Sequence, residues 1–169
     1  MSENTRREPG PSPDRPDFSE AYGVSANVEG MLPWDRADER LAESRNYWIG
    51  TTRPDGRPHA APVWGVWVAG ALVFGTDPRS QKARNIRSNP ALTMHLESGE
   101  DVVIVEGVVE EADPELLAAA EAAYRDKYGM GLEEAAGQGG VWYALRPVVA
   151  YAWLESDFAR SPTRWTFDA

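Results

Sequence analysis

The sequence contains no cysteine, which excludes disulfides, thiolate nucleophiles, iron–sulfur clusters and zinc sites built on cysteine. Histidine is nearly as scarce, and because His59 and His95 lie far apart in the sequence we predict no structural metal site. No apolar run reaches the ~20 residues that a membrane-spanning helix needs, and the polar N-terminus lacks the apolar stretch of a signal peptide. We therefore expect a cytoplasmic protein with no membrane partner.

Positive charge is also in short supply. The 27 acidic residues outnumber the 17 basic ones and give a formal net charge of -10. Phosphate backbones and anionic lipids repel such a chain, so we expect neither nucleic acid nor a membrane surface as a partner. A site for an anion must therefore be a local exception to the overall charge. With 169 residues, 42% of them hydrophobic, the chain is expected to form one domain plus tails.

The first 30 residues hold little that a core could bury, because they are polar and rich in proline. We predict a flexible or draped N-terminal arm over residues 1–30, with Phe18 and Tyr22 as possible anchors. The folded domain is then expected over residues 31–169.

Downstream of the arm, segments rich in β-branched and aromatic residues alternate with turn signals such as Pro-Asp-Gly. Because tight turns join antiparallel strands, we predict a mainly β (α+β) fold, an antiparallel barrel of about six or seven strands with a few short helices. The strands are predicted over 46–52, 59–68, 71–76, 91–97, 101–110, 141–145 and 148–155. The helices are predicted over 34–45, 77–89 and 113–128, with a Gly-rich mobile loop over 130–139.

The strand predicted over 59–68 is apolar on both faces. Pro62 and Trp64 lie on one face, and Val63 and Trp67 lie on the other, because side chains alternate along a strand. We therefore expect the barrel interior to cover one face and a partner surface to cover the other.

Basic residues gather in the segment 76–90, which holds Arg79, Lys82, Arg84 and Arg87. A helix that begins at Asp77-Pro78 or at Ser80 places Arg79 and Lys82 in its first turn, where the helix dipole disfavours cations. A phosphate beside them would satisfy both charges, with free backbone N–H groups and the hydroxyls of Thr76 and Ser80 as further donors. The alternative is a solvated basic helix paired with surface carboxylates. The segment is not a P-loop, because the GK[ST] signature is absent.

Several short motifs follow one another in a recognisable order. They are Gly56, Pro58, Pro62-Val63-Trp64, Thr76, Ser80-Gln81-Lys82, Asn85-Ile86, Asn89-Pro90 and Val103–Gly107. This order resembles the split β-barrel flavin/deazaflavin oxidoreductase superfamily, which includes the pyridoxamine 5'-phosphate oxidase-like proteins. The ending RSPTRWTF, residues 160–167, resembles its actinobacterial branch. The resemblance covers roughly residues 34–167 and implies that the barrel is a split β-barrel.

The resemblance also implies a homodimer with two cofactor sites at the subunit interface, each holding FMN or the deazaflavin F420. The residues that it implies for the cofactor phosphate are Thr76, Ser80, Lys82 and Asn85. Those that it implies beside the ring system are Pro62, Val63 and Trp64. Gln81 stands where family members often have Arg or Lys, and Arg79 is expected to substitute for that residue.

The function expected from the resemblance is an oxidoreductase that uses F420 for hydride transfer to a small, planar, unsaturated substrate. The alternatives are an FMN-binding oxidoreductase and a non-catalytic protein that binds a flavin-type or haem-type ligand. Trp64 and Trp165 are candidates for stacking on a planar substrate, whereas core or dimer packing is the simpler interpretation for most other tryptophans. His59 is a candidate proton donor, although a hydrogen-bonded strand residue is the simpler interpretation. The sequence designates no catalytic residue, since the cofactor itself carries this kind of chemistry.

Overall fold

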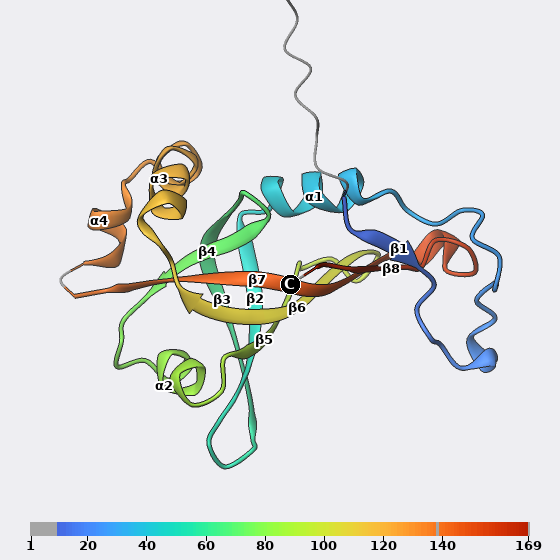
Figure 1. Ribbon diagram of the computed structural model, residues 1–169, viewed down its shortest axis with the longest axis horizontal. Helices are drawn as coiled ribbons and strands as arrows, with labels where there is room; N and C mark the ends of the chain where they lie inside the picture. The colour runs from blue at the N-terminus through green and yellow to red at the C-terminus, as the bar shows by residue number, and fades with distance from the viewer. Residues whose placement is uncertain (1–9, 138, 169) are drawn as a thin grey trace, which may run out of the picture.

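The structure is a computed structural model that describes residues 10–137 and 139–168 (Figure 1). Six strands of the described chain form a closed antiparallel barrel in the order β7-β4-β3-β2-β5-β6, with β6 pairing back onto β7. Their bounds are β2 (Asn46–Thr52), β3 (Pro58–Val68), β4 (Ala71–Thr76), β5 (Ala91–His95), β6 (Asp101–Glu111) and β7 (Val141–Leu154). The predicted antiparallel barrel is therefore confirmed.

Two short strands extend the barrel sheet on one side, β1 (Ser12–Asp14) and β8 (Thr163–Thr166). The first part of β7 pairs with β4, and its later part pairs with β8, which in turn pairs with β1. Figure 1 shows this extension leading away from the barrel. The sequence analysis predicted neither strand, because three or four residues are too few to show a period-2 pattern.

The prediction of two strands over 141–145 and 148–155 was wrong, because β7 runs without a break. Pro147 lies opposite Gly107, at a register shift in β6 between Glu106 and Gly107. A bulge of this kind accommodates a proline, which cannot donate to the sheet ladder. A Cβ atom at Gly107 would lie 2.0 Å from Arg146 O, so this crossing requires glycine.

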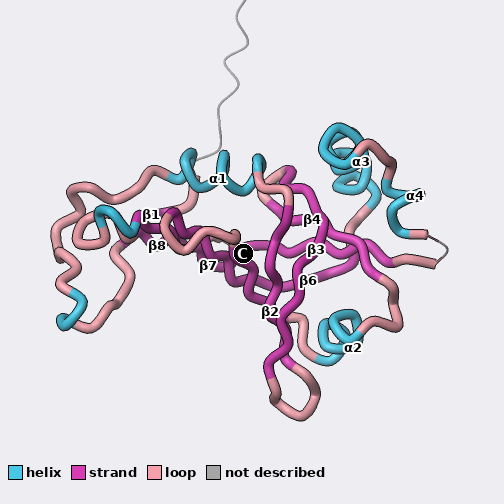
Figure 2. Tube along the Cα trace, turned by 180° about the vertical axis from the view of Figure 1, so that it is seen from behind, coloured by secondary structure: helices cyan, strands magenta, loops and turns pink. Residues whose placement is uncertain are grey.

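The helices lie around the barrel rather than inside it (Figure 2). They are α1 (Trp34–Glu43), α2 (Gln81–Ser88), α3 (Pro114–Tyr128) and α4 (Leu132–Ala136), with short 3-10 turns η1 (Glu20–Tyr22) and η2 (Glu155–Asp157). The loop predicted over 130–139 therefore contains a short helix, and residue 138 lies outside the described residues. None of the helices in the described ranges has the length and apolar character needed to cross a membrane.

Two hydrophobic clusters cover the two faces of β3. Val63 and Trp67 point into the barrel core, while Val66 packs under α3 against Leu116 and Tyr124. The outer face of β3 beyond α3 is open, and Trp64 there remains 44% exposed. The inner face of β3 is thus buried in the barrel core, whereas its outer face is covered only where α3 packs on it, around Val66.

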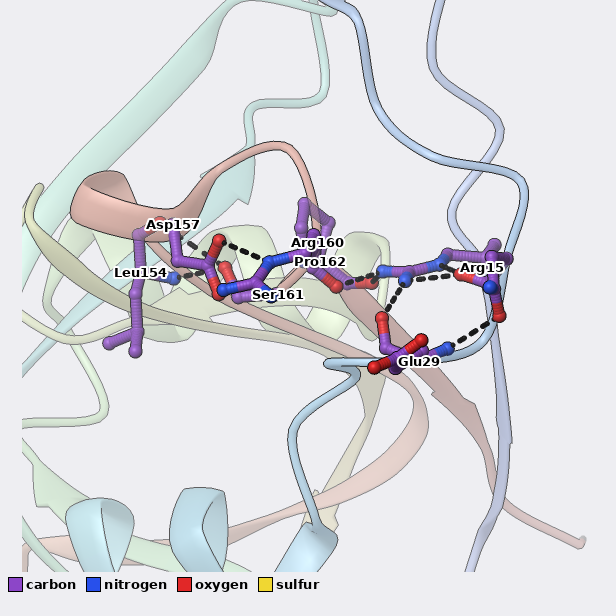
Figure 3. A network of polar contacts seen from close by, with 8 residues as sticks. Arg15, Glu29, Leu154, Asp157, Arg160, Ser161 and Pro162 are labelled. Carbon is purple, nitrogen blue, oxygen red and sulfur yellow. Dashed lines mark hydrogen bonds and ion pairs between the residues drawn. The ribbon is translucent and has the colours of Figure 1, made fainter.

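Residues 10–30 of the predicted arm lie along the C-terminal segment. The Arg15 guanidinium donates hydrogen bonds to the backbone carbonyls of Asn27, Glu29, Arg160 and Pro162 (Figure 3). The predicted anchor Phe18 contacts Trp153 and Phe158, at ring-centroid distances of 6.2 and 5.6 Å. Residues 1–9 of the arm lie outside the described residues.

Candidate functional site

Two hydroxyl groups meet at the start of α2. Strand β4 ends at Thr76, and Ser80 caps the helix by accepting a hydrogen bond from the backbone N–H of Ala83 at 3.2 Å. The Thr76 and Ser80 hydroxyl oxygens lie 3.1 Å apart, so they form one polar cluster. Of the two helix starts that the sequence allowed, the structure has the one at Ser80.

Lys82 is the second residue of α2 and is half-buried. Its ammonium group makes no hydrogen bond or ion pair with any residue in the described ranges. A cation at a helix N-terminus faces the positive end of the helix dipole. The backbone N–H groups of Gln81 and Lys82 also lack intrahelical acceptors, as the first N–H groups of any helix do. This end of α2 therefore presents donors and positive charge, the set that binds a phosphate.

Arg79 does not join this cluster. It precedes the helix cap rather than lying in the first turn, and it pairs with Asp77 at 2.9 Å while remaining 88% exposed. The hydrogen bonds from Arg79 lower the pKa of the Asp77 carboxyl to about 2. Arg79 therefore already has a local anionic partner, and the structure does not bring it to Lys82.

Asn85 is completely buried beneath α2. Its side-chain amide donates to Thr51 Oγ1 at 2.9 Å, and its carbonyl oxygen accepts from Gln81 Nε2 at 2.7 Å. Asn85 thus ties α2 to β2 and has no surface for a ligand. Gln81 connects this network to the exposed side of the helix, because its oxygen accepts from Arg84 Nη2 at 2.8 Å.

The two candidate substrate contacts lie in different surroundings. His59 is half-buried on β3, with Nδ1 3.4 Å from the same Thr51 hydroxyl that Asn85 contacts. Trp165 is 1% exposed and packs in the core against Trp34, at a centroid distance of 5.3 Å. In this chain Trp165 offers no surface to a substrate, because β8 carries it under α1.

Of the three residues expected beside the cofactor ring, two face outward. Val63 is buried in the core, while Pro62 and Trp64 lie on the open face of β3. The Trp64 ring stacks on Tyr128, with centroids 4.8 Å apart and planes inclined by 10°. The sequence analysis missed Tyr128, although it follows Tyr124 at a spacing of four residues, which shares one side of a helix.

Strand β3 connects these two regions. His59, near one end of β3, lies beside the network under α2, and Trp64 lies beside the C-terminal end of α3. At ~3.3 Å per residue the two positions are roughly 16 Å apart along the strand. In the ranges that the structure describes, no group of three His, Asp or Glu side chains converges so that it could hold a metal ion.

Comparisons with known proteins agree with this fold. A family profile described as pyridoxamine 5'-phosphate oxidase matches residues 33–154. A solved structure described as an F420 reductase is 30% identical in sequence to this chain, with a TM-score of 0.53. The alignment covers 66% of this chain and 94% of the F420 reductase chain.

Two further structures support the fold alone. A conserved hypothetical protein from Mycobacterium tuberculosis is 22% identical, with a TM-score of 0.64, and the alignment covers 76% of this chain and 89% of that protein. A haem-binding protein from Mycobacterium smegmatis is 20% identical, with a TM-score of 0.58, and the alignment covers 77% of this chain and 62% of that protein. No curated protein sequence matches this chain.

Proposed function

Because the chain belongs to the pyridoxamine 5'-phosphate oxidase family, we propose that it is an F420-dependent oxidoreductase that reduces a small, planar, unsaturated substrate. The observation that carries this proposal is the half-buried Lys82, which has no partner in the described ranges and follows by two residues the Ser80 cap, whose hydroxyl contacts that of Thr76. In a chain with a net charge of -10, carboxylates are abundant, yet none pairs with Lys82 in the described ranges. A phosphate is the partner that this donor set accommodates.

The residues present fit the phosphate of a flavin-type cofactor. Lys82 would neutralise the charge, and the Thr76 and Ser80 hydroxyls with the free N–H groups of α2 would donate hydrogen bonds. When bound, the cofactor supplies the hydride. Pro62 and Trp64 would border the ring from the open face of β3 and exclude water from it.

Other residues act indirectly in this proposal. The Gln81–Asn85–Thr51 hydrogen bonds fix α2 against β2, which sets the position of Lys82 relative to β3. Because His59 contacts the same Thr51 hydroxyl, we assign it to this positioning network in preference to the role of proton donor. Arg79 remains outside the site, paired with Asp77.

F420 is favoured over FMN by one comparison. The structure described as an F420 reductase is 30% identical and is covered over 94% of its length by this chain. FMN is the alternative, because either cofactor carries a phosphate that the start of α2 could bind.

We also propose that the active form is a homodimer with the cofactor between two copies. The outer face of β2, β3 and β5 is open, and it presents Trp64 together with Trp48, whose ring lies parallel to that of His95. A shallow groove of about 340 Å³ crosses this face between Gly50 and Glu106. A second copy seated over Trp48 and His95 would cover these two rings, leave the α3 side of β3 open, and close the cofactor site.

Titration of the purified protein with F420, FMN and haem separately tests the proposal. A ligand that binds only the native state raises its stability, by about 2.7 kcal/mol at a concentration of 100 Kd. We expect F420 to raise the melting temperature most, and its reduced form to be oxidised steadily when a quinone is added. Tighter binding of FMN or haem would replace F420 in the proposal, and no binding by any of the three would refute it.

A further inference from the structure

A second place where cations lack carboxylate partners lies farther along β3, near its middle. There the junction between α1 and β2 meets β3 and the C-terminal end of α3, and we call this place the α3 corner: Arg45, Trp64, Lys127 and Tyr128. The Arg45 guanidinium carbon lies 5.6 Å from the centroid of the Trp64 ring and 5.2 Å from that of Tyr128. A cation therefore sits beside a stacked aromatic pair that is open to solvent.

Lys127 supplies the second positive charge of the α3 corner. Its ammonium donates to Ser44 O at 2.8 Å, to Tyr47 Oη at 3.1 Å and, more weakly, to Gly65 O at 3.4 Å. All three acceptors are uncharged, so these contacts orient Lys127 but do not neutralise it. Burial, with a smaller effect from Arg45, lowers the pKa of Lys127 to about 8, so it is still largely charged at neutral pH.

Arg45 retains most of its hydrogen-bonding capacity. It donates one bond, to Lys127 O at 3.3 Å, and it pairs with no carboxylate in the described ranges. Two neighbouring cations repel each other, and such a pair is most stable with an anion beside it. A guanidinium has a planar set of donors that matches a carboxylate in two parallel hydrogen bonds.

The aromatic pair specifies the shape of the ligand. Tyr128 covers part of Trp64, and the indole is still 44% exposed. The Tyr128 hydroxyl also fixes the strand beneath it, because it accepts from Gly65 N at 3.0 Å and lies 2.9 Å from Gly65 O. A rigid, partly exposed indole next to a guanidinium suits a flat conjugated molecule with a negative group at its edge.

We propose that the α3 corner is a substrate subsite that binds a planar, conjugated carboxylic acid. The ring system stacks on Trp64, the carboxylate binds Arg45, and Lys127 adds positive potential. The identification of this ligand as the hydride acceptor rests on the proposed function, since Trp64 also borders the proposed cofactor ring. The binding itself depends only on the residues of the corner.

Calorimetric titration with anthraquinone-2-carboxylate and with the neutral anthraquinone-2-carboxamide tests this subsite. The two probes share a ring system and differ in charge. We expect the wild-type protein to prefer the carboxylate, and Arg45→Gln to weaken carboxylate binding at least tenfold while leaving carboxamide binding unchanged. Arg53→Gln is the matched control, because the Arg53 side chain makes no hydrogen bond or ion pair with a carboxylate in the described ranges and lies on the β2–β3 hairpin away from Trp64.

Arg45→Lys provides a second comparison, since it keeps the charge and loses the planar donor set. It should retain an intermediate preference for the carboxylate. Equal binding of the two probes, no binding of the carboxylate at millimolar concentration, or an unchanged preference in Arg45→Gln would overturn the subsite. If wild-type protein bound neither F420 nor FMN yet showed the Arg45-dependent preference, the proposed function would fail and the subsite would stand.

Discussion

At the scale of single residues, the main features are cations without carboxylate partners in an acidic protein. Lys82 makes no hydrogen bond or ion pair with any residue of the described ranges, whereas Lys127 is held by neutral acceptors in a half-buried position. The surroundings of Lys127 disfavour its charged form, which gives the residue a measurable signature in the pH dependence of stability.

We predict that the contribution of Lys127 to the free energy of unfolding increases as the pH rises from about 8 towards 10.5. The pKa of Lys127 falls from 10.5 to about 8 on folding, so between these values the unfolded chain binds a proton that the native state does not. Stability increases with pH wherever the unfolded state binds more protons. Urea unfolding at about pH 7.5 and about pH 9.5 should show wild-type protein gaining stability relative to Lys127→Met.

This range avoids the tyrosines, whose effect has the opposite sign. Burial raises the pKa of Tyr124 to about 12, so the native state keeps a proton that the unfolded state loses above about pH 10. Parallel pH profiles for wild type and Lys127→Met would contradict the prediction.

The sequence could identify residues that lie close together in the chain. Thr76, Ser80 and Lys82 share one turn and one helix start, so a local argument about caps and dipoles was enough to bring them together. It could not place Asn85, because the burial of that side chain depends on how α2 packs against β2. Nor could it pair Trp64 with Tyr128, which belong to separate elements brought together only by the packing of α3 on β3.

At the scale of elements, the part of the fold least accessible from the sequence is the extension formed by β1 and β8. The barrel strands have clear turns and apolar faces, and five of the six were predicted within a few residues of their observed ends, while β7 was predicted as two strands. The extension instead depends on contacts between segments far apart in the sequence, among them Arg15, which binds the backbone carbonyls of Glu29 and Pro162 (Figure 3). A composition argument detects the prolines of this arm but not such a contact.

We predict that Arg15→Ala releases β1 from β8 while the barrel stays folded. Hydrogen bonds from a charged donor contribute about 1.5–3 kcal/mol, and several are lost together here. Hydrogen exchange should accelerate at the amides of β8 and remain unchanged in β2 and β5. The control is Arg57→Ala, which removes an exposed arginine that pairs with Asp55 in the hairpin. Equal protection of β8 in wild type and Arg15→Ala would show that Arg15 does not hold the extension.

At the scale of the whole molecule, the net charge of -10 and the open outer face of the sheet act against each other. Apolar and aromatic side chains on β2 and β3 favour association, while the charge of two identical chains opposes it. Association should therefore strengthen as salt screens the repulsion.

We predict that sedimentation gives twice the chain mass of 18.6 kDa at micromolar concentration, and that added salt stabilises this dimer. Trp48→Glu, which places a charge on the open face, should yield monomers that remain folded. Glu106→Gln on the same face is the control, because it removes a charge and should not weaken the dimer. A monomeric wild-type protein at every salt concentration would refute the dimer and leave the cofactor site open to solvent.

The proposed function depends above all on binding of the cofactor phosphate at the start of α2. The most direct test measures the binding free energy of the better-bound cofactor and of its phosphate-free counterpart, which is riboflavin for FMN and the deazariboflavin for F420. Both ligands are titrated into wild type, into Lys82→Ala and into the control Arg87→Ala, which changes the same helix. We predict that Lys82→Ala costs about 1.5–3 kcal/mol of binding free energy for the phosphorylated ligand and almost nothing for its counterpart, with Arg87→Ala close to wild type. An equal loss for both ligands, or no loss for either, would contradict the account.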